Sequence, residues 1–178
     1  MKLSNPFSTE RMNFRLLTMD DLEVVYRQFS DPDMCKYFSE PPVDLKEAKE
    51  IIEHYKDPEG KGFLRYGMFD KSTNAFIGTV GYHYWDPNRK QVEIGYDIWK
   101  DYWRQGYISE ALPPLIKICF NYLDVDFVYI LTHPENHASI KSVTKLGFIE
   151  CPPLREIDVE PQICLKLPRI EWNNRLSF

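Results

Sequence analysis

The sequence predicts an α+β fold built around one mixed β-sheet. Its 178 residues suit one domain with a buried core, and 43% hydrophobic with 28% charged residues is a globular balance. The predicted elements follow in the order strand, two helices, three strands, helix, strand, helix and two strands. Short turns favour antiparallel pairing of the three central strands, and the next helix fits a right-handed crossover to a parallel strand.

The N-terminal part shows two helix signals after a strand-like run at residues 14–17. Thr18 caps the first helix, whose apolar residues recur at helical spacing until Asp31-Pro32 ends it. The second helix is expected at about residues 44–56. It starts at a variant of the capping box formed by Asp44 and by Glu47 three residues later.

The central part predicts three strands followed by a long helix. The strands are separated by clusters of turn residues, so we expect an antiparallel meander. A helix is expected over residues 107–122, and Pro113-Pro114 should kink it because two backbone donors are missing. The three strands are expected at residues 63–69, 76–84 and 91–99.

The C-terminal part alternates again between strand and helix. A strand is expected at residues 127–132 and a helix at 136–146, which Gly147 ends in the left-handed conformation. Two closing strands are expected at residues 148–156 and 162–167.

Charge and composition exclude several classes of partner. A net charge of −5 with no Lys/Arg block argues against nucleic acid. No apolar run is long enough to span a bilayer and the start lacks a signal-peptide core, so a soluble, cytoplasmic protein is expected. The four scattered cysteines form no C-x-x-C pair, which favours reduced thiols and no metal.

The expected domain covers residues 1–178 as a single unit. Its core is expected over about residues 12–168. A short tail, residues 169–178, carries Trp172 and Phe178. It could pack on its own subunit or on another one in a homodimer.

The most informative stretch is residues 93–112, where a strand, a short loop and a helix follow one another. Backbone N–H groups at a helix N-terminus form a site for phosphate oxygens. Gly106 lets the backbone approach a ligand, Arg104 adds positive charge and Ser109 adds a hydroxyl. Alone, this pattern fits a plain strand–turn–helix equally well. It matches neither G-x-x-x-x-G-K-[ST] nor G-x-G-x-x-G, which disfavours a nucleoside-triphosphate or dinucleotide site.

Two segments together resemble a known family. Glu93-Ile94-Gly95-Tyr96, followed by residues 103–112, resembles the acetyl-CoA signature of the GNAT acetyltransferases, most closely the branch that acetylates N-termini of ribosomal proteins. Residues 133–142 and Lys145-Leu146-Gly147-Phe148 are similar to that branch's Asn-x-x-Ser and Lys-Leu-Gly-Phe segment. The resemblance covers about residues 14–167. It implies a mostly antiparallel central sheet with helices on both faces, acetyl-CoA as co-substrate, and a peptide N-terminus or small amine as acceptor.

The resemblance also implies roles for matching residues. Backbone groups of Ile98 and Trp99 would face the pantetheine arm and thioester of acetyl-CoA. Asn136 would bond the arm, and Ser139 and Ser142 would lie near it. The N–H groups implied to hold the pyrophosphate are those of Arg104, Gln105, Gly106, Tyr107, Ile108 and Ser109.

The catalytic groups are less well defined. Ile108 replaces a usual Gly or Ala, which could tighten the loop, and Val143 replaces the Tyr that many members use as proton donor. The donor is therefore open between water and a hydroxyl such as Ser139. Glu93 matches the base of several members, with Glu150 as second candidate. Either could instead be an ordinary solvated carboxylate or act through a water.

Other residues and functions stay open. His83 could line an acceptor cleft or be a hydrogen-bonded structural residue. His133, which precedes Pro134, could have no role beyond shaping its loop. Tyr37 and Phe38 could border the acceptor or pack in the core. The alternative function is a catalytically inactive GNAT-like coenzyme A-binding sensor or interaction domain, which only Val143 supports. A nucleotide-binding α/β protein would need a phosphate-loop motif.

Overall fold

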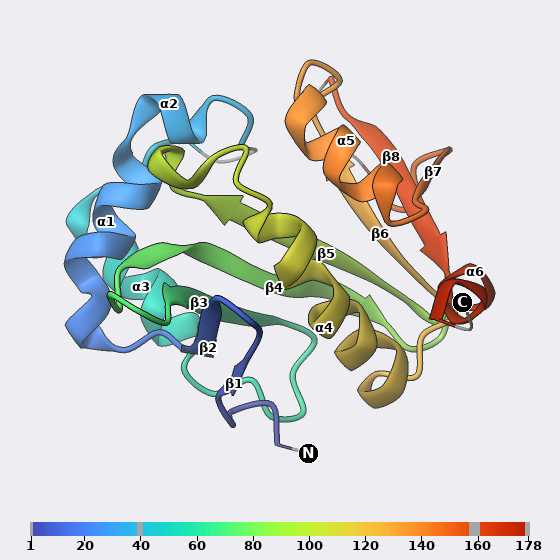
Figure 1. Cartoon of the computed structure of the whole chain (residues 1–178), viewed down its shortest axis with the longest axis horizontal. Coiled ribbons are helices and arrows are strands. Elements are labelled where there is room, and N and C mark those ends of the chain that lie inside the picture. The colour runs from blue at the N-terminus through green and yellow to red at the C-terminus, as the bar shows by residue number, and fades with distance from the viewer. Residues whose placement is uncertain (1, 39–40, 157–160, 177–178) are drawn as a thin grey trace.

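The computed structural model describes residues 2–38, 41–156 and 161–176, and a single mixed sheet runs through this part of the chain. Its strands are β1 (Phe7–Ser8), β2 (Met12–Leu16), β3 (Leu64–Asp70), β4 (Phe76–Asp86), β5 (Gln91–Ile98), β6 (Phe127–Thr132), β7 (Ile149–Cys151) and β8 (Ile163–Pro168). The strand order is β1-β2-β3-β4-β5-β6-β8-β7 (Figure 1). The pair β5–β6 is parallel and its neighbours are antiparallel, so the predicted mixed, mostly antiparallel sheet is confirmed.

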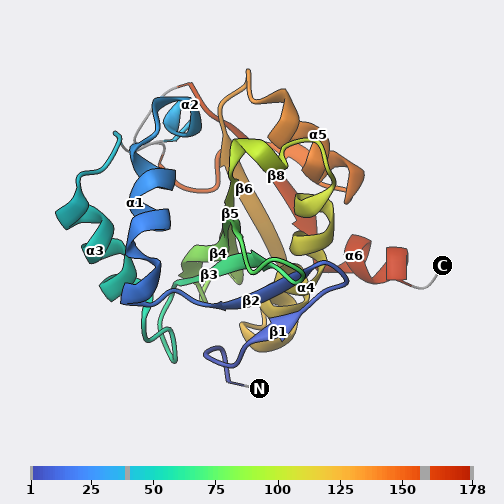
Figure 2. The same cartoon turned by 60° about the vertical axis from the view of Figure 1, so that its left-hand side comes forward.

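Helices cover both faces of the sheet, as predicted (Figure 2). One face packs on α4 and α5 in the main core, and the other on α1 and α3, where a second cluster includes Val25, Ala48 and Phe69. The helices are α1 (Leu22–Ser30), α2 (Pro32–Cys35), α3 (Leu45–Tyr55), α4 (Tyr107–Tyr122), α5 (His137–Lys145) and α6 (Arg169–Leu176).

The N-terminal helices begin at the predicted caps. The carboxylate of Asp21 accepts the N–H and the hydroxyl of Thr18, and a 3₁₀ turn (Met19–Asp21) leads into α1. Asp44 and Glu47 exchange side-chain-to-backbone hydrogen bonds of 2.8 and 2.7 Å, which is the predicted capping box of α3. The starts of both helices could be predicted from the sequence because a cap depends on residues within one turn of each other.

The short helix α2 was not predicted. The Asp31-Pro32 pair does end α1, but the Asp31 side chain also accepts the N–H groups of Asp33 and Met34 and so caps α2. Pro32 at the first helical position loses no intrahelical bond there. The same two residues thus stop one helix and start the next, which turns the chain sharply.

Helix α4 continues through Pro113 and Pro114. Each proline removes an i→i−4 hydrogen bond, which is why a kink was expected. Their neighbours Leu112, Leu115 and Ile116 are fully buried against the sheet. This apolar contact holds the helix as one element despite the missing donors.

The predicted tail is a helix that belongs to the core. Trp172 on α6 is 7% exposed and lies in the main core. Arg169 donates to the carbonyls of Phe120 and Val125, which fixes the start of α6 on its own chain. The core therefore extends beyond residue 168, and Trp172 packs on its own subunit. Phe178 lies outside the described residues.

The feature that positions the site is the separation of β5 from β6. The two strands pair over Gln91 to Glu93 and Phe127 to Tyr129. Beyond Glu93 they diverge, and Figure 1 shows β5 running toward α2 while β6 runs toward α5. Strand edges that separate inside a sheet leave backbone groups available for another hydrogen-bonding molecule.

Candidate active site

The loop before α4 has the geometry of an anion site. Gly106 is the N-cap of α4 with φ 83°, and Arg104 has φ 60°. Left-handed residues beside right-handed ones turn successive N–H groups toward one side, and the helix N-terminus adds positive potential. The first-turn N–H groups, up to Ser109, have no acceptor within the helix.

Arg11 is bound to this loop, and the sequence did not indicate the contact. Its Nη1 donates to the carbonyl of Gln105 at 2.9 Å, and its Nε pairs with Glu110 at 2.7 Å. A Cβ added to Gly106 would lie 3.6 Å from Arg11 Nη2. Arg11 therefore brings a second cation beside Gly106. No local signal could reveal it, because 94 residues separate it from Gln105.

The size of Ile108 does not narrow the loop. The side chains of Ile108 and Tyr107 are buried in the main core, so the two residues offer the loop their backbone. Arg104, Gln105 and Ser109 are exposed. The departure at Ile108 is thus accommodated by packing on the sheet side of α4.

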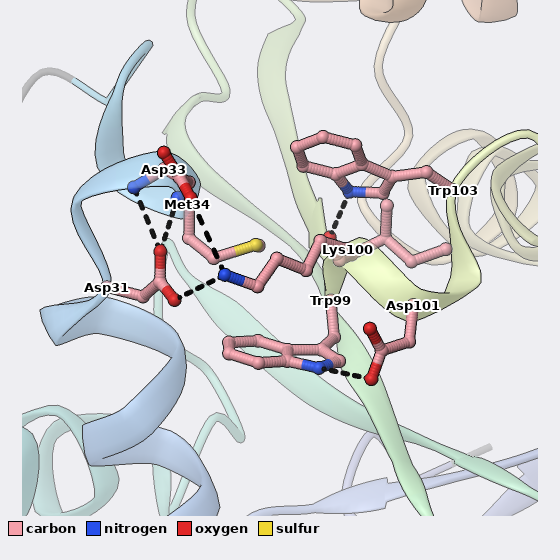
Figure 3. Close-up of polar contacts among 8 residues, drawn as sticks. Asp31, Asp33, Met34, Trp99, Lys100, Asp101 and Trp103 are labelled. Atoms are coloured by element: carbon pink, nitrogen blue, oxygen red, sulfur yellow. Dashed lines mark hydrogen bonds and ion pairs between the residues drawn. The ribbon is translucent and has the colours of Figure 1, made fainter.

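The end of β5 is held by two tryptophans and a lysine (Figure 3). The Trp103 indole donates to the Ile98 carbonyl at 2.7 Å, and Lys100 reaches Asp31 at 3.0 Å, which ties this turn to the α1–α2 junction. Trp99 donates its N–H to Ile77 and accepts the N–H of Tyr102 through its carbonyl. Both backbone groups of Trp99 are thus engaged. Ile98, one residue earlier, directs its backbone to the open side of β5.

We call the separation of β5 from β6 beyond Glu93 the opening. Helix α5 begins after β6, on the side of the opening away from β5. The Asn136 side chain caps it by accepting the N–H of Ser139 at 3.2 Å. The Ser142 hydroxyl donates to the Ala138 carbonyl within the helix, and Val143 is fully buried. The residues predicted here therefore differ in role. Asn136 and Ser139 form the N-terminal cap of α5, whereas the hydroxyl of Ser142 bonds to a carbonyl within the helix.

Tyr96 joins β5 to α5. Its hydroxyl lies 2.9 Å from Ser139 Oγ and donates to the Ser139 carbonyl at 3.3 Å. Burial raises the pKa of Tyr96 to about 12, so the phenol keeps its proton at neutral pH. The sequence signature contains Tyr96 but assigned it no role, because its partner is 43 residues away.

Glu93 is a buried, paired carboxylate. It is 6% exposed, its Oε2 accepts Arg155 Nε at 2.7 Å, and its Oε1 lies 3.1 Å from His83 Nε2. Burial alone would raise the pKa of Glu93, but the hydrogen bonds and charges of His83 and Arg155 outweigh it and lower that pKa. Glu93 is therefore not a solvated strand carboxylate, and His83 is hydrogen-bonded. Arg155 was missed, because its loop gives no sequence signal.

This pairing makes a pH-dependent contribution to stability. The folded pKa of Glu93 lies below its ordinary value of 4.5, so the contribution is present above that pH and is lost as pH falls through the folded pKa. We expect Glu93→Gln to be less stable than the wild type at pH 7. The difference should shrink as pH falls through the folded pKa of Glu93, because the carboxyl is then neutral like the glutamine side chain. Urea unfolding at a series of pH values measures this. An equal difference at every pH would show that the ion pair does not carry the effect.

The second candidate base lies elsewhere. Glu150 is exposed on β7, opposite Leu165 of β8, and two strands lie between β7 and β5. Leu165 belongs to the main core, so Glu150 points to the α5 side of the sheet, whereas Glu93 points to the other side. The two carboxylates do not form one site.

The residues between α2 and α3 have separate roles. The ring of Tyr37 stacks on that of His133 at 5.3 Å, which connects the segment after α2 to the end of β6. Phe38 packs on the second core, 5.8 Å from the ring of Phe29. Tyr37 thus contacts the residue that follows β6, and Phe38 packs in the second core.

A buried polar cluster lies between β5 and α1, and the sequence did not indicate it. Asp97 accepts the N–H of Thr79 at 3.0 Å and its hydroxyl at 2.5 Å, and also bonds to Gln28 and Arg65. These residues come from α1, β3, β4 and β5. The cluster fixes α1 against the strand end at which Ile98 lies.

The comparisons with known proteins agree with this geometry. Residues 11–149 match the family model described as the acetyltransferase (GNAT) domain, so the chain belongs to the GNAT acetyltransferase family. An uncharacterized N-acetyltransferase, p20 of Bacillus licheniformis, is 33% identical over 142 residues, 79% of this chain and 80% of that protein. A Vibrio cholerae structure assigned as a ribosomal-protein-serine acetyltransferase is 25% identical with a TM-score of 0.78, covering 94% of this chain and 99% of the other.

A further solved structure shows the fold at lower identity. It is the spermidine N-acetyltransferase of Vibrio cholerae in complex with CoA and spermine, 16% identical, with a TM-score of 0.78 over 92% of this chain and 99% of that one. Within the described residues, no group of three His, Cys, Asp or Glu side chains could hold a metal ion. No helix in that part of the chain is long and apolar enough to cross a membrane.

Proposed function

We propose that this protein is an N-acetyltransferase that transfers the acetyl group of acetyl-CoA to a primary amine. The observation that carries the proposal is the divergence of β5 and β6 between two helix N-termini. One N-terminus offers the N–H groups of residues 104–109, with Arg104 and Arg11 beside them, to a pyrophosphate. The other offers Asn136 and Ser139 to the pantetheine arm.

The separated edge of β5 would bind the arm between these ends. Ile98 has its backbone on the open side, where its carbonyl now accepts the Trp103 indole. Binding through that carbonyl requires the indole to share it or to leave. Positioning of an already activated thioester supplies much of the rate of such a reaction.

The Tyr96–Ser139 pair is our candidate for protonating or stabilising the departing thiolate. Both hydroxyls lie on the α5 side of β5, where Val143 carries no hydroxyl. A phenol that remains protonated can donate a hydrogen bond to a developing anion directly or through Ser139. This supports an enzyme over an inactive coenzyme A-binding domain, since the missing Tyr at position 143 was the only argument for the latter.

The acceptor is an amine whose identity the site does not specify. The related proteins named above suggest two classes to screen, peptides with an N-terminal serine and polyamines. An amine must be neutral to attack, and most amines are protonated at pH 7, so the site needs a proton acceptor. We place that acceptor in the Glu93 cluster.

The proposed function predicts selective stabilisation by acetyl-CoA. A ligand at 100 times its Kd stabilises the folded state by about 2.7 kcal/mol. Acetyl-CoA should therefore raise the midpoint of thermal unfolding by several degrees, whereas ATP and NAD should not. Release of the free CoA thiol in the presence of peptide and polyamine acceptors then measures turnover. Equal shifts with ATP and NAD, or none with acetyl-CoA, would contradict the proposal.

A further inference from the structure

His83 is the more exposed member of the pair that it forms with Glu93. The side chain of His83 is 28% exposed and that of Glu93 is 7% exposed. The imidazole lies over Gly95, since a Cβ added there would be 3.0 Å from His83 Cε1. Gly95 is within the part of β5 that no longer pairs with β6. The glycine of the signature thus makes room for a histidine at the start of the opening.

The backbone beside His83 is strained. Tyr84 has φ 51°, and the β4–β5 register shifts between His83 and Asp86. An aromatic residue in the left-handed region is rare, and such strain and bulges concentrate at functional sites. A surface hollow of about 430 Å³ opens beside the cluster, with Tyr84, Tyr129 and Arg155 among its lining residues. The hollow thus reaches Arg155, whose Nε pairs with Glu93, and Tyr84, whose ring lies 5.1 Å from that of His83.

The hydrogen bonds determine which nitrogen of His83 is basic. A carboxylate only accepts, so Nε2 donates its hydrogen to Glu93 and Nδ1 is left as the acceptor of the neutral ring. Both oxygens of Glu93 are engaged, one by His83 and one by Arg155. Glu93 is therefore arranged to orient the ring, and the imidazole is arranged to take a proton.

We propose that His83 Nδ1 removes the proton from the acceptor amine, with Glu93 as the residue that positions it. This inference rests on the proposed function. The ammonium group gives one proton to Nδ1, and the neutral amine nitrogen then bonds to the acetyl carbon. The C–S bond breaks with its electron pair on sulfur, and the nitrogen loses its second proton. The thiolate and the imidazolium take up or release protons to leave an amide, a thiol and one proton in solution.

The charges around His83 permit this cycle. The pairing with Arg155 keeps Glu93 ionised, so a carboxylate lies beside the imidazole whether or not the ring carries a second proton. His is the side chain whose charge ordinarily changes between pH 5 and 8. The titratable and charged groups beside this cluster are Glu93 of β5, Arg155 after β7, Tyr84 of β4 and Tyr129 of β6. On the same face of the sheet, beyond Gly95, lie Asp97 of β5 and its partner Arg65 of β3.

The test compares His83→Gln with His54→Gln, a matched control on α3 whose ring stacks on Phe63. General-base catalysis contributes about 10²- to 10⁴-fold, so kcat of His83→Gln should fall by about that factor with CoA affinity unchanged. His54→Gln should keep the wild-type rate. In the wild type, the NMR titration of His83 should coincide with the acidic limb of the kcat/KM profile. Glu93→Gln should shift the NMR titration of His83 and the acidic limb of the profile together, because both report the same imidazole.

Three results would decide against the inference. The first is His83→Gln with the wild-type rate while Glu93→Gln is inactive, which assigns the base to Glu93 itself. The second is a His83 titration that does not coincide with the rate profile, a measurement that needs no variant to fold. The third is a wild type that neither binds CoA nor transfers acetyl, which overturns the proposed function as well. The first two leave the proposed function standing.

Discussion

Replacing Gly106 by glutamate is expected to lower the affinity for acetyl-CoA at least about 100-fold, or about 2.8 kcal/mol. Gly106 adopts φ 83°, a conformation that costs an L-residue roughly 1–2 kcal/mol. The added side chain has space, since its Cβ would meet Arg11 Nη2 at 3.6 Å. A carboxylate at this N-cap would place negative charge where the phosphates are proposed to bind, and it would compete for Arg11.

Gly106→Ala is the matched control for this variant. It introduces the same backbone strain without charge, so it should reduce stability by roughly 1–2 kcal/mol and should lower the affinity much less than the glutamate does. Isothermal titration with acetyl-CoA measures the affinities, and thermal unfolding without ligand shows that both variants fold. Wild-type affinity in Gly106→Glu would mean that the phosphates bind elsewhere.

Replacing Gly81 by alanine is expected to destabilise the fold by at least about 3 kcal/mol, or to prevent folding. Gly81 lies in β4 between Arg65 of β3 and Gly95 of β5. A Cβ there would be 1.9 Å from the carbonyl oxygen of Leu64. That atom belongs to the backbone of a paired strand, so no side-chain rotation relieves the contact and the two strands would have to separate.

Gly62→Ala is the control for this second variant. A Cβ on Gly62 would meet its nearest neighbours, atoms of Trp85, at 3.8 Å, an ordinary van der Waals contact. Its effect on the free energy of unfolding should stay within about 0.5 kcal/mol. Equilibrium unfolding in urea compares both variants with the wild type. A Gly81→Ala protein as stable as Gly62→Ala would show that β3 and β4 can move apart at little cost.

Close spacing made much of the fold predictable. The start of α3 depends on Asp44 and Glu47, three residues apart, and Gly147 ends α5 in the left-handed conformation with φ 95°. The helix 107–122 was predicted with the bounds that the structure has. The loop 104–109 before α4 is equally local, so its place between a strand and a helix N-terminus could be predicted from the sequence.

Packing over long distances decided what local patterns could not. Residues 169–176 were expected to be a tail, because nothing near them indicates what they cover. Trp172 becomes a core residue only when the folded chain brings the apolar residues of the main core against it. Helix α4 is a second example, because it continues as one element through its two prolines, whose apolar neighbours are buried.

The sequence by itself thus determined the fold class, the bounds of most elements and the family, including the segment that forms the candidate phosphate loop. The tertiary structure decided how the candidate catalytic groups are combined: Glu93 with His83 and Arg155, and Tyr96 with Ser139. The physical reason is the range of the interactions. Caps and turns involve groups a few residues apart, whereas a carboxylate's protonation and a hydroxyl's orientation depend on side chains that only the assembled sheet brings within 3 Å or so.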